Sequence, residues 1–165
     1  MDTDSSGLML ILAFVFVLLN AFFVLSEFAI VKIRKSKLEE LSKDGVKNAK
    51  MAYEITNSLD SYLSATQLGI TISSLALGWI GEPAVAMLIE KPINSIFEAN
   101  ATVIHSVSFI ISFTFITLLH VVLGELVPKS VAIATPEKSV LFVAKPLHAF
   151  WVIFKPFIEI GRAHV

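Results

Sequence analysis

The chain contains no cysteine, so it can form neither a disulfide bond nor a thiolate metal site. Charged residues are also scarce: they make up 16% of the 165 residues, against about 25% in soluble domains. The formal net charge is −1, so we expect no nucleic-acid partner. Hydrophobic residues reach 55%, a composition typical of a protein embedded in a lipid bilayer.

The apolar residues gather in three runs that are long enough to cross a bilayer, for which about 20 residues suffice. The runs cover residues 8–33, 59–80 and 102–127. Lysine and arginine are enriched just after the first run, which marks the cytoplasmic side and places the N-terminus outside. We therefore predict an all-α integral membrane domain over residues 1–158. It has three transmembrane helices and short juxtamembrane or amphipathic helices over residues 36–58 and 130–158.

Two segments beyond these runs are apolar but interrupted by proline. Residues 81–101 are predicted to connect the second and third runs outside the membrane, through short half-buried helices. In the second segment, residues 139–157, we predict a kinked helix in the inner leaflet. A fourth span over residues 141–157 is the competing topology, and Lys145, Pro146 and Pro156 count against it.

The last seven residues, 159–165, differ in character from the rest of the chain. They resemble the in-frame translation of a common sequencing adapter. We therefore expect this tail to be an artefact and the natural chain to continue in its place.

The third run ends in a carboxylate flanked by residues that loosen a helix. Glu125 follows Gly124, which permits close approach of another backbone or an ion. Pro128 has no N–H group, so it leaves the carbonyl of Gly124 without its helical hydrogen bond. A carboxylate beside a free carbonyl offers the hard oxygen ligands that Mg²⁺ or Na⁺ accepts. The alternative is a helix end at the membrane surface, with Glu125 and Lys129 in water.

Polar residues also interrupt the first two runs. In the first run, Asn20, Ser26 and Glu27 fall on or beside one face at helical spacing. This stripe indicates a hydrogen-bonded seam between helices, which we favour for Asn20, or an ion path, which we favour for Ser26 and Glu27. In the second run, residues 67–74 include an amide, a glycine and several hydroxyl groups. They favour a cation path over close packing of small residues.

His120 lies about one helical turn before Glu125. A single histidine within a membrane helix is more often hydrogen-bonded to a neighbouring helix than bound to a metal. Since no second histidine stands at ligand spacing, we do not expect a zinc site.

Three motifs occur in a fixed order: Asn20–Ala29 (NAFFVLSEFA), Gln67–Thr71 (QLGIT) and Gly124–Lys129 (GELVPK). Together with the hydropathy they resemble the transmembrane domain of the CorC/CNNM (cyclin M) family, also described as hemolysin-C-related proteins. The resemblance extends over the whole chain up to the tail.

For this chain the resemblance implies a homodimeric, multi-pass protein of the plasma membrane that carries Mg²⁺, exporting it in exchange for Na⁺. The dehydrated ion would lie near the middle of the three spans, with Glu125 as its acidic ligand. The implied metal-site residues are Glu125, Ser26, Gly69, Ile70, Thr71 and Ser74. Supporting positions are Asn20, Glu27, Gln67, Ser73, Gly124, Pro128 and Lys129.

The chain departs from the family pattern where relatives near the animal branch have asparagine, because Ile70 stands there. Backbone carbonyls or nearby hydroxyls such as that of Thr71 would replace the missing side chain. Family members usually continue into a cytoplasmic pair of CBS domains that binds ATP. We therefore expect the bulk of the full-length protein in the cytoplasm, with ATP acting only through those domains.

Two other functions compete with transport. The chain could be a non-transporting dimeric membrane anchor or sensor for the missing CBS domains, its polar seams serving only to pack helices. An intramembrane enzyme is the third hypothesis. The chain has no Gly-x-Ser-x-Gly, no His-Glu-x-x-His and no paired membrane aspartates, so we predict that it is not an enzyme.

Overall fold

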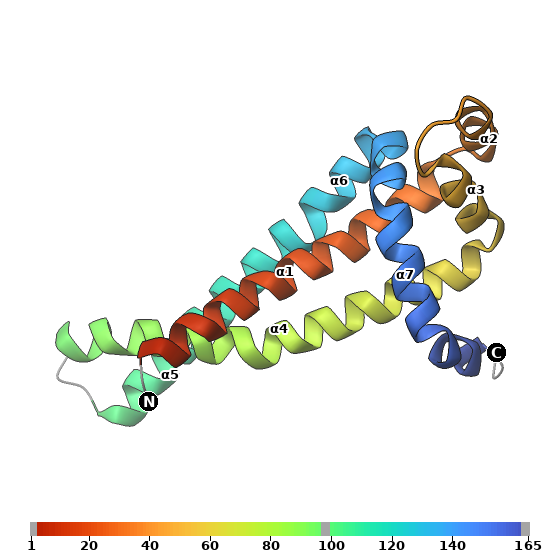
Figure 1. The fold of residues 1–165 in the computed structure, drawn as a ribbon. Coiled ribbons are helices and arrows are strands. Elements are labelled where there is room, and N and C mark those ends of the chain that lie inside the picture. The colour runs from red at the N-terminus through yellow and green to blue at the C-terminus, as the bar shows by residue number, and fades with distance from the viewer. Residues whose placement is uncertain (1–2, 97–99, 163–165) are drawn as a thin grey trace.

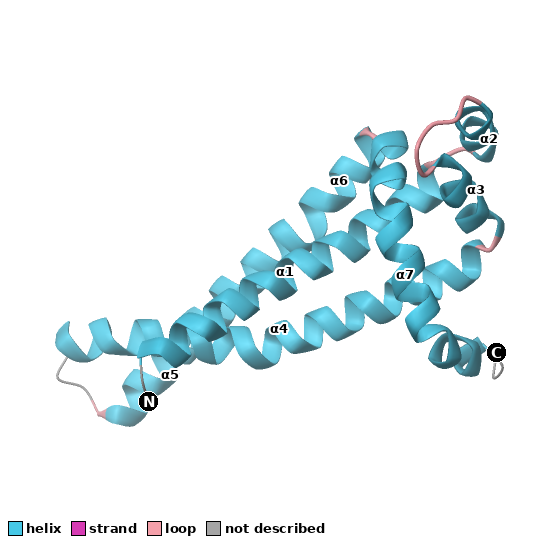
Figure 2. Ribbon diagram, in the orientation of Figure 1, coloured by secondary structure: helices cyan, strands magenta, loops and turns pink. Residues whose placement is uncertain are grey.

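A computed structural model describes residues 3–96 and 100–162, and within that part of the chain every regular element is a helix (Figure 2). In chain order the elements are α1 (Thr3–Lys32), α2 (Lys35–Lys43), α3 (Ala49–Asn57), α4 (Leu59–Ile96), α5 (Ala101–Leu119), the π-helix η1 (His120–Leu126), α6 (Val127–Ala134) and α7 (Pro136–Arg162). The predicted all-α membrane fold is confirmed. Residues 163–165, the end of the expected tail, lie outside the described residues, and the origin of that tail stays a prediction.

Helices α1 and α4 lie side by side with a long rod made of α5, η1 and α6 (Figure 1). Near the outer end, one apolar core contains Val17 of α1, Leu77 of α4 and Ile116 of the rod. The buried residues of the rod recur every four positions and include Ile104, Ser108, Ser112, Ile116, Gly124, Pro128 and Ala132. This spacing produces one narrow packed face, and leaves the rest of the rod uncovered.

Four segments of the described chain are long and apolar enough to cross a bilayer: Gly7–Lys32, Leu59–Asn94, Ala101–Ala134 and Pro136–Ile158. The first three contain the three predicted spans. The fourth belongs to α7, which Figure 1 shows running across the ends of α1 and α4 instead of alongside them. That direction favours the predicted location along the inner leaflet.

Helix α7 is one continuous helix with Pro146 and Pro156 inside it, so neither proline ends it, and the predicted kink stays a prediction. Each proline removes only one helical hydrogen bond, and tertiary contacts offset that loss. Leu147 of α7 is buried in the inner core. Nearby, the Trp151 indole donates a hydrogen bond to Ser61 Oγ at 2.8 Å, and the Tyr62 hydroxyl lies 2.7 Å from Nδ1 of His148. These bonds attach α7 to the start of α4.

Helix α4 extends well past residue 80, where the second span was predicted to end. Residues 81–96 are helical, as predicted, but they continue α4 through Pro83 and Pro92 instead of forming separate short helices. The physical reason is burial: Val85 packs into the outer core with Val17 and Leu77. Figure 1 shows α4 reaching beyond the start of α1.

The segment 36–58, for which short juxtamembrane helices were predicted, contains two helices, α2 and α3. Gly45 and Asn48 between them have φ values of 73° and 67°, which interrupt a right-handed helix. The Asn48 side chain donates a hydrogen bond to the Leu141 carbonyl at 2.9 Å, which holds this turn against α7.

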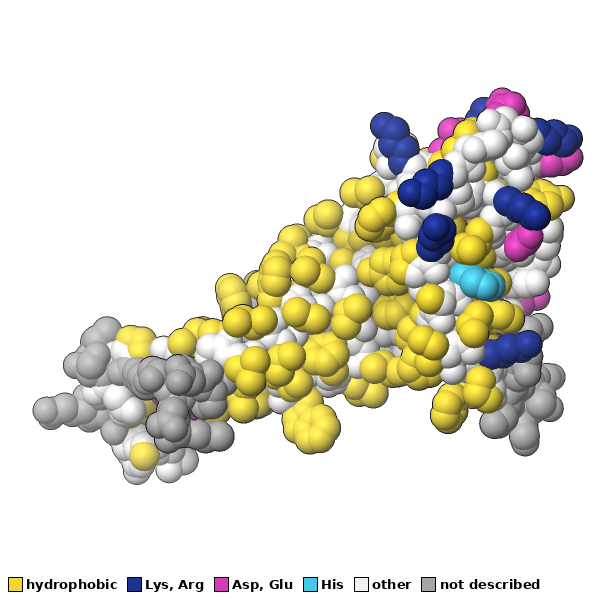
Figure 3. Space-filling model, viewed as in Figure 1, with side chains coloured by type: hydrophobic (Ala, Val, Ile, Leu, Met, Phe, Trp, Pro, Cys, Tyr) yellow, Lys and Arg dark blue, Asp and Glu magenta, His cyan; other side chains and the backbone are white. Residues whose placement is uncertain are grey.

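Charged side chains gather at one end of the molecule, over α2, α3 and the start of α7, and yellow apolar side chains cover the middle (Figure 3). The charges include ion pairs on the solvent side: Lys43 lies 2.8 Å from Glu39, and this hydrogen bond lowers the pKa of the Glu39 carboxyl. The distribution agrees with the predicted cytoplasmic location of this end, which rests on the excess of lysine and arginine.

Candidate functional site

A cluster of polar side chains connects α1, α4 and η1. The fully buried Asn20 of α1 donates from Nδ2 to the Gly124 carbonyl at 3.0 Å. Its Oδ1 accepts a hydrogen bond from Ser74 Oγ of α4 at 3.1 Å, and Ser74 Oγ lies 3.4 Å from His120 Nε2. Because the only Ser74 hydroxyl proton goes to Asn20, His120 would donate from Nε2. We call Asn20, Ser74, His120 and Gly124 the central polar cluster.

The cluster lies close to the middle of the bilayer. Asn20 precedes Lys32, at the cytoplasmic end of α1, by 12 residues, which is about 18 Å along a helix. Half of a bilayer's hydrocarbon core measures about 15 Å. Lipid offers no hydrogen-bond partners at this depth, so polar groups there bond to one another or to water that reaches them.

The carbonyl of Gly124 accepts a hydrogen bond from another helix, donated by Asn20 Nδ2. The chain around Gly124 is a π-helix, His120–Leu126. Such segments are rare and occur often at functional sites. The predicted hydrogen-bonded seam at Asn20 is confirmed, whereas the predicted role of Pro128 stays a prediction.

Gly124 is also required by the close approach of α1. A Cβ atom there would lie 2.7 Å from His120 Cδ2 and 3.0 Å from Asn20 Nδ2. The His120 ring lies in η1 itself and the Asn20 amide lies in α1, so a larger residue would require one or both of these side chains to shift. The structure shows a side chain of α1 close to Gly124, and the predicted approach of an ion stays a prediction.

The motif around Gly69 lies elsewhere along α4 and packs instead against an aromatic ring. A Cβ atom on Gly69 would lie 2.5 Å from the Phe23 ring of α1. Ser73 Oγ donates to the Gly69 carbonyl at 2.8 Å, and the exposed Thr71 donates to the Gln67 carbonyl at 2.8 Å. Gln67 is itself exposed and Ile70 is half-buried. These predicted site residues do not join the central polar cluster.

Three other predicted residues lie on the cytoplasmic side of the cluster. Ser26 is fully buried, and its hydroxyl donates to the Phe22 carbonyl of its own helix at 2.7 Å. Glu27 is half-buried. The Lys129 ammonium lies 4.7 Å from the centroid of the Phe28 ring, a cation–π contact that connects α6 to α1.

Glu125 points away from the central polar cluster although it is adjacent to Gly124 in the chain. Its side chain is exposed, and within the described residues it forms no hydrogen bond or ion pair. That same part of the chain contains no group of three acidic or histidine side chains arranged to hold a metal ion. The geometry therefore brings Asn20, Ser74 and Gly124 together and leaves Glu125 on the uncovered face.

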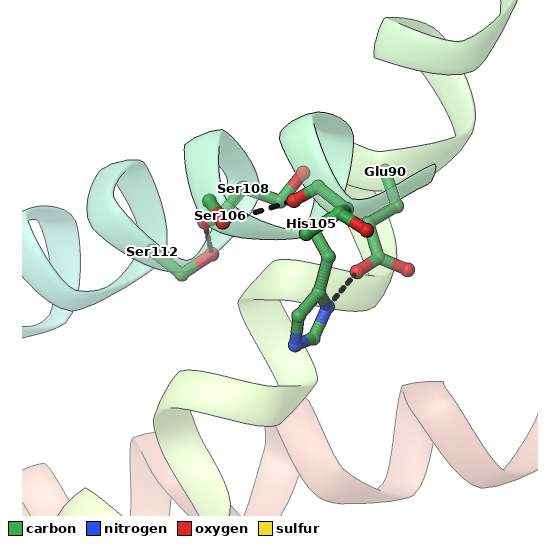
Figure 4. Close-up of polar contacts among 6 residues, drawn as sticks. Glu90, His105, Ser106, Ser108 and Ser112 are labelled. Atoms are coloured by element: carbon green, nitrogen blue, oxygen red, sulfur yellow. Dashed lines mark hydrogen bonds and ion pairs between the residues drawn. The ribbon is translucent and has the colours of Figure 1, made fainter. Parts of the chain in front are cut away.

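Two hydroxyl groups nearer the outer end, those of Ser106 and Ser112, bond within their own helix, whereas the buried Ser108 hydroxyl has no hydrogen-bond partner among the described residues (Figure 4). Ser106 and Ser112 each donate to the carbonyl four residues earlier, at 2.9 and 2.6 Å. His105 Nδ1 lies 2.9 Å from a carboxylate oxygen of Glu90, which connects α5 to α4. These contacts indicate helix packing, since such internal bonds leave no free donor for a ligand.

His120 is the one member of the cluster absent from the predicted site. The sequence feature that could have identified His120 is its position four residues before Gly124, because this spacing places both residues on one helical face. The prediction that it hydrogen-bonds to a neighbouring helix is supported by the contact with Ser74.

The family model described as "Cyclin M transmembrane N-terminal domain" matches residues 11–162. The chain belongs to this family. Similar proteins include the UPF0053 protein YhdT of Bacillus subtilis, with 47% identity over 96% of the chain, and the UPF0053 protein sll0260 of Synechocystis, with 36% identity over 96%. An uncharacterized protein of Mycobacterium tuberculosis, MT1889, is 35% identical over 91%. The chain spans 33%, 35% and 42% of these three relatives, in that order.

The cluster makes a testable contribution to the stability of this cyclin M domain. Replacing Asn20 by alanine leaves the Gly124 carbonyl and the Ser74 hydroxyl without their partner. We expect the free energy of unfolding to fall by about 1–2 kcal/mol. Titration with a denaturing detergent measures it. The control is Leu19→Ala, whose side chain is 40% exposed on the lipid-facing side. Equal stability of the two variants would show that the cluster contributes nothing.

Proposed function

We propose that this domain carries Mg²⁺ across the plasma membrane, exporting it in exchange for Na⁺, with the ion bound beside η1. The observation that carries the proposal is the central polar cluster, where α1, α4 and η1 meet at mid-bilayer depth. A π-helix at that point supports it further, because such segments leave backbone groups available for ligands. Family membership and the resemblance of all three motifs agree with it.

The oxygen chemistry of the cluster suits a hard cation. Asn20 Oδ1, Ser74 Oγ and the Gly124 carbonyl converge from three elements, and Mg²⁺ prefers oxygen ligands in near-octahedral geometry. Glu125 points away from the cluster in this structure, so its side chain would have to turn towards the ion to add one negative charge. A single carboxylate leaves the bound ion with net positive charge, which favours release over storage.

Ser26, Gly69, Ile70 and Thr71 remain part of the proposed ligand set on the strength of the resemblance. Hydroxyl groups of Ser26 and Thr71 are bonded to carbonyls of their own helices. To act as ligands they would exchange those bonds for the ion. The binding state would therefore differ from the present arrangement by local movements in α1 and α4.

The exposed position of Glu125 supports a homodimer. A carboxylate exposed to lipid at this depth is costly, and membrane proteins place such groups against protein or water. Around it, Val122, Leu126 and Val127 are also exposed. A second copy packed over this face of η1 and α6 would remove Glu125 from lipid and keep it beside Gly124.

The experiment that tests transport uses the purified chain in liposomes loaded with Mg²⁺ and a Mg²⁺-sensitive dye. We expect Mg²⁺ to leave when an inward Na⁺ gradient is imposed, and to stay when K⁺ replaces Na⁺. Mg²⁺ release at the same rate in both salts would contradict Na⁺ coupling. No release above that of empty liposomes would contradict transport by this chain.

The second function is a dimeric anchor or sensor for cytoplasmic CBS domains that bind ATP. It is favoured by the many hydroxyl groups bonded to their own helices, as at Ser106 and Ser112. Mg²⁺-dependent protection of Glu125 from carboxyl labelling, without flux, would support it over transport. Catalysis is not proposed.

A further inference from the structure

A cavity of about 320 Å³ that opens to the surface of the molecule lies between α4 and α5 and reaches Ser74 and His120 of the central polar cluster. Helix α4 lines it with Ser74, Gly78 and Glu82, and α5 lines it with Phe109, Phe113 and Thr117. Within each helix these residues are four positions apart, so each set follows a single helical face. His120 of the cluster closes the inner end beside Ser74.

The cavity is elongated along α4. Ser74 and Glu82 are eight residues apart, which corresponds to about 12 Å of helix. Since α4 runs outward from its start at the cytoplasmic surface, Glu82 lies at the outer end and Ser74 at the inner end. The sequence placed Glu82 in an outer connection, whereas the structure includes it in the helix that lines the cavity.

Gly78 occupies the middle of the passage and is unlike the two packed glycines. A Cβ atom on Gly78 would have no heavy atom within 4 Å. Gly69 and Gly124, by contrast, lie against other side chains, and a Cβ atom on either would overlap one of them. The absence of a side chain at residue 78 therefore widens the cavity without serving helix contact.

We propose that this cavity is the outer access passage of the ion site and that Glu82 binds cations at its mouth. A carboxylate within a membrane helix marks a functional site, because it is costly unless a cation, water or another polar group meets it. Phe109 and Phe113 can direct their ring faces at a passing cation. The inference rests on the proposed function, since it assigns the route by which hydrated Mg²⁺ or Na⁺ reaches the outside.

Single cysteines test the passage directly, because the chain has none of its own. The Gly78→Cys variant places a thiol in the cavity. The matched control is Trp79→Cys, one residue further along α4, whose native side chain is 84% exposed and does not line the cavity. A membrane-impermeant cationic methanethiosulfonate is added to the outside of vesicles containing the whole chain. Denatured samples measure the total thiol of each variant.

We expect the Gly78→Cys thiol to react at least tenfold faster than the Trp79→Cys thiol, because a thiolate forms in water and not in lipid. The cationic reagent should also react faster than an anionic one of similar size. Adding Glu82→Gln should abolish that preference, because the attracting charge is removed.

Equal rates at residues 78 and 79 would overturn the passage. A cationic preference that survives Glu82→Gln would overturn the role of Glu82. Labelling needs no transport, so this result is independent of the test of Na⁺-driven flux. Fast, charge-selective labelling in a chain without flux supports the passage and rejects the transport function. If the chain transports Mg²⁺ but the thiols at residues 78 and 79 react at equal rates, the passage is rejected and the transport function is not.

Discussion

At limiting Mg²⁺ in liposomes, the Na⁺-dependent Mg²⁺ flux of the Glu125→Gln variant is expected to be at least tenfold lower than that of the native chain. Glutamine keeps the size of the side chain but removes the negative charge that the proposed site contributes. The ion would then have only neutral oxygen ligands, which cannot replace the water that Mg²⁺ releases reluctantly. A tenfold loss corresponds to about 1.4 kcal/mol of lost stabilisation.

The control for this prediction is Glu90→Gln, which removes a carboxylate from α4 at the outer end, where it contacts His105. We expect this variant to keep its flux. Both variants should insert in membranes and elute as single species in detergent, because neither carboxylate is part of a buried core. Wild-type flux from the Glu125→Gln variant would refute the role of this carboxylate.

The Gly69→Ala variant is expected to lose about 1–3 kcal/mol of its free energy of unfolding. The new Cβ atom would lie 2.5 Å from the Phe23 ring. That ring is 6% exposed and its centroid lies 4.7 Å from the centroid of the Phe150 ring, so it has little room to move. Helices α1 and α4 would have to separate. Titration with a denaturing detergent measures the loss.

Gly78→Ala is the matched control on the same helix, since its Cβ atom meets nothing within 4 Å. Alanine also has the higher helix propensity, so we expect this variant to be at least as stable as the native chain. Adding Phe23→Leu to Gly69→Ala should recover part of the loss, a coupling that appears only between contacting residues. Equal stability of Gly69→Ala and Gly78→Ala would reject the close contact.

The membrane fold and part of the cluster could be predicted from the sequence alone. Long apolar runs have one low-energy solution in a bilayer, a helix that satisfies its own backbone, so the spans follow from composition. Gly124 and Pro128 are four residues apart, about one helical turn. The prediction that Pro128 affects hydrogen bonding to the Gly124 carbonyl therefore needed only local sequence. Asn20, a polar residue in the middle of an apolar run, had to find a partner on another helix.

Other features depended on contacts between distant segments. The second span was predicted to end at residue 80, before Pro83, but α4 continues to Ile96 and buries Val85 in the outer core. The hydroxyl of Ser74 joins Asn20, whereas those of Ser26 and Thr71 bond to their own helices. Periodicity cannot distinguish these outcomes, because each hydroxyl can reach either a neighbouring helix or the carbonyl four residues before it.

The sequence by itself determined which segments are long and apolar enough to cross the membrane, because this depends on hydrophobicity and length. Only the tertiary structure decided which polar groups meet. The rotation of each helix is set by its packing partners, and it turned Asn20 inward, exposed Glu125, and placed Glu82 along a cavity.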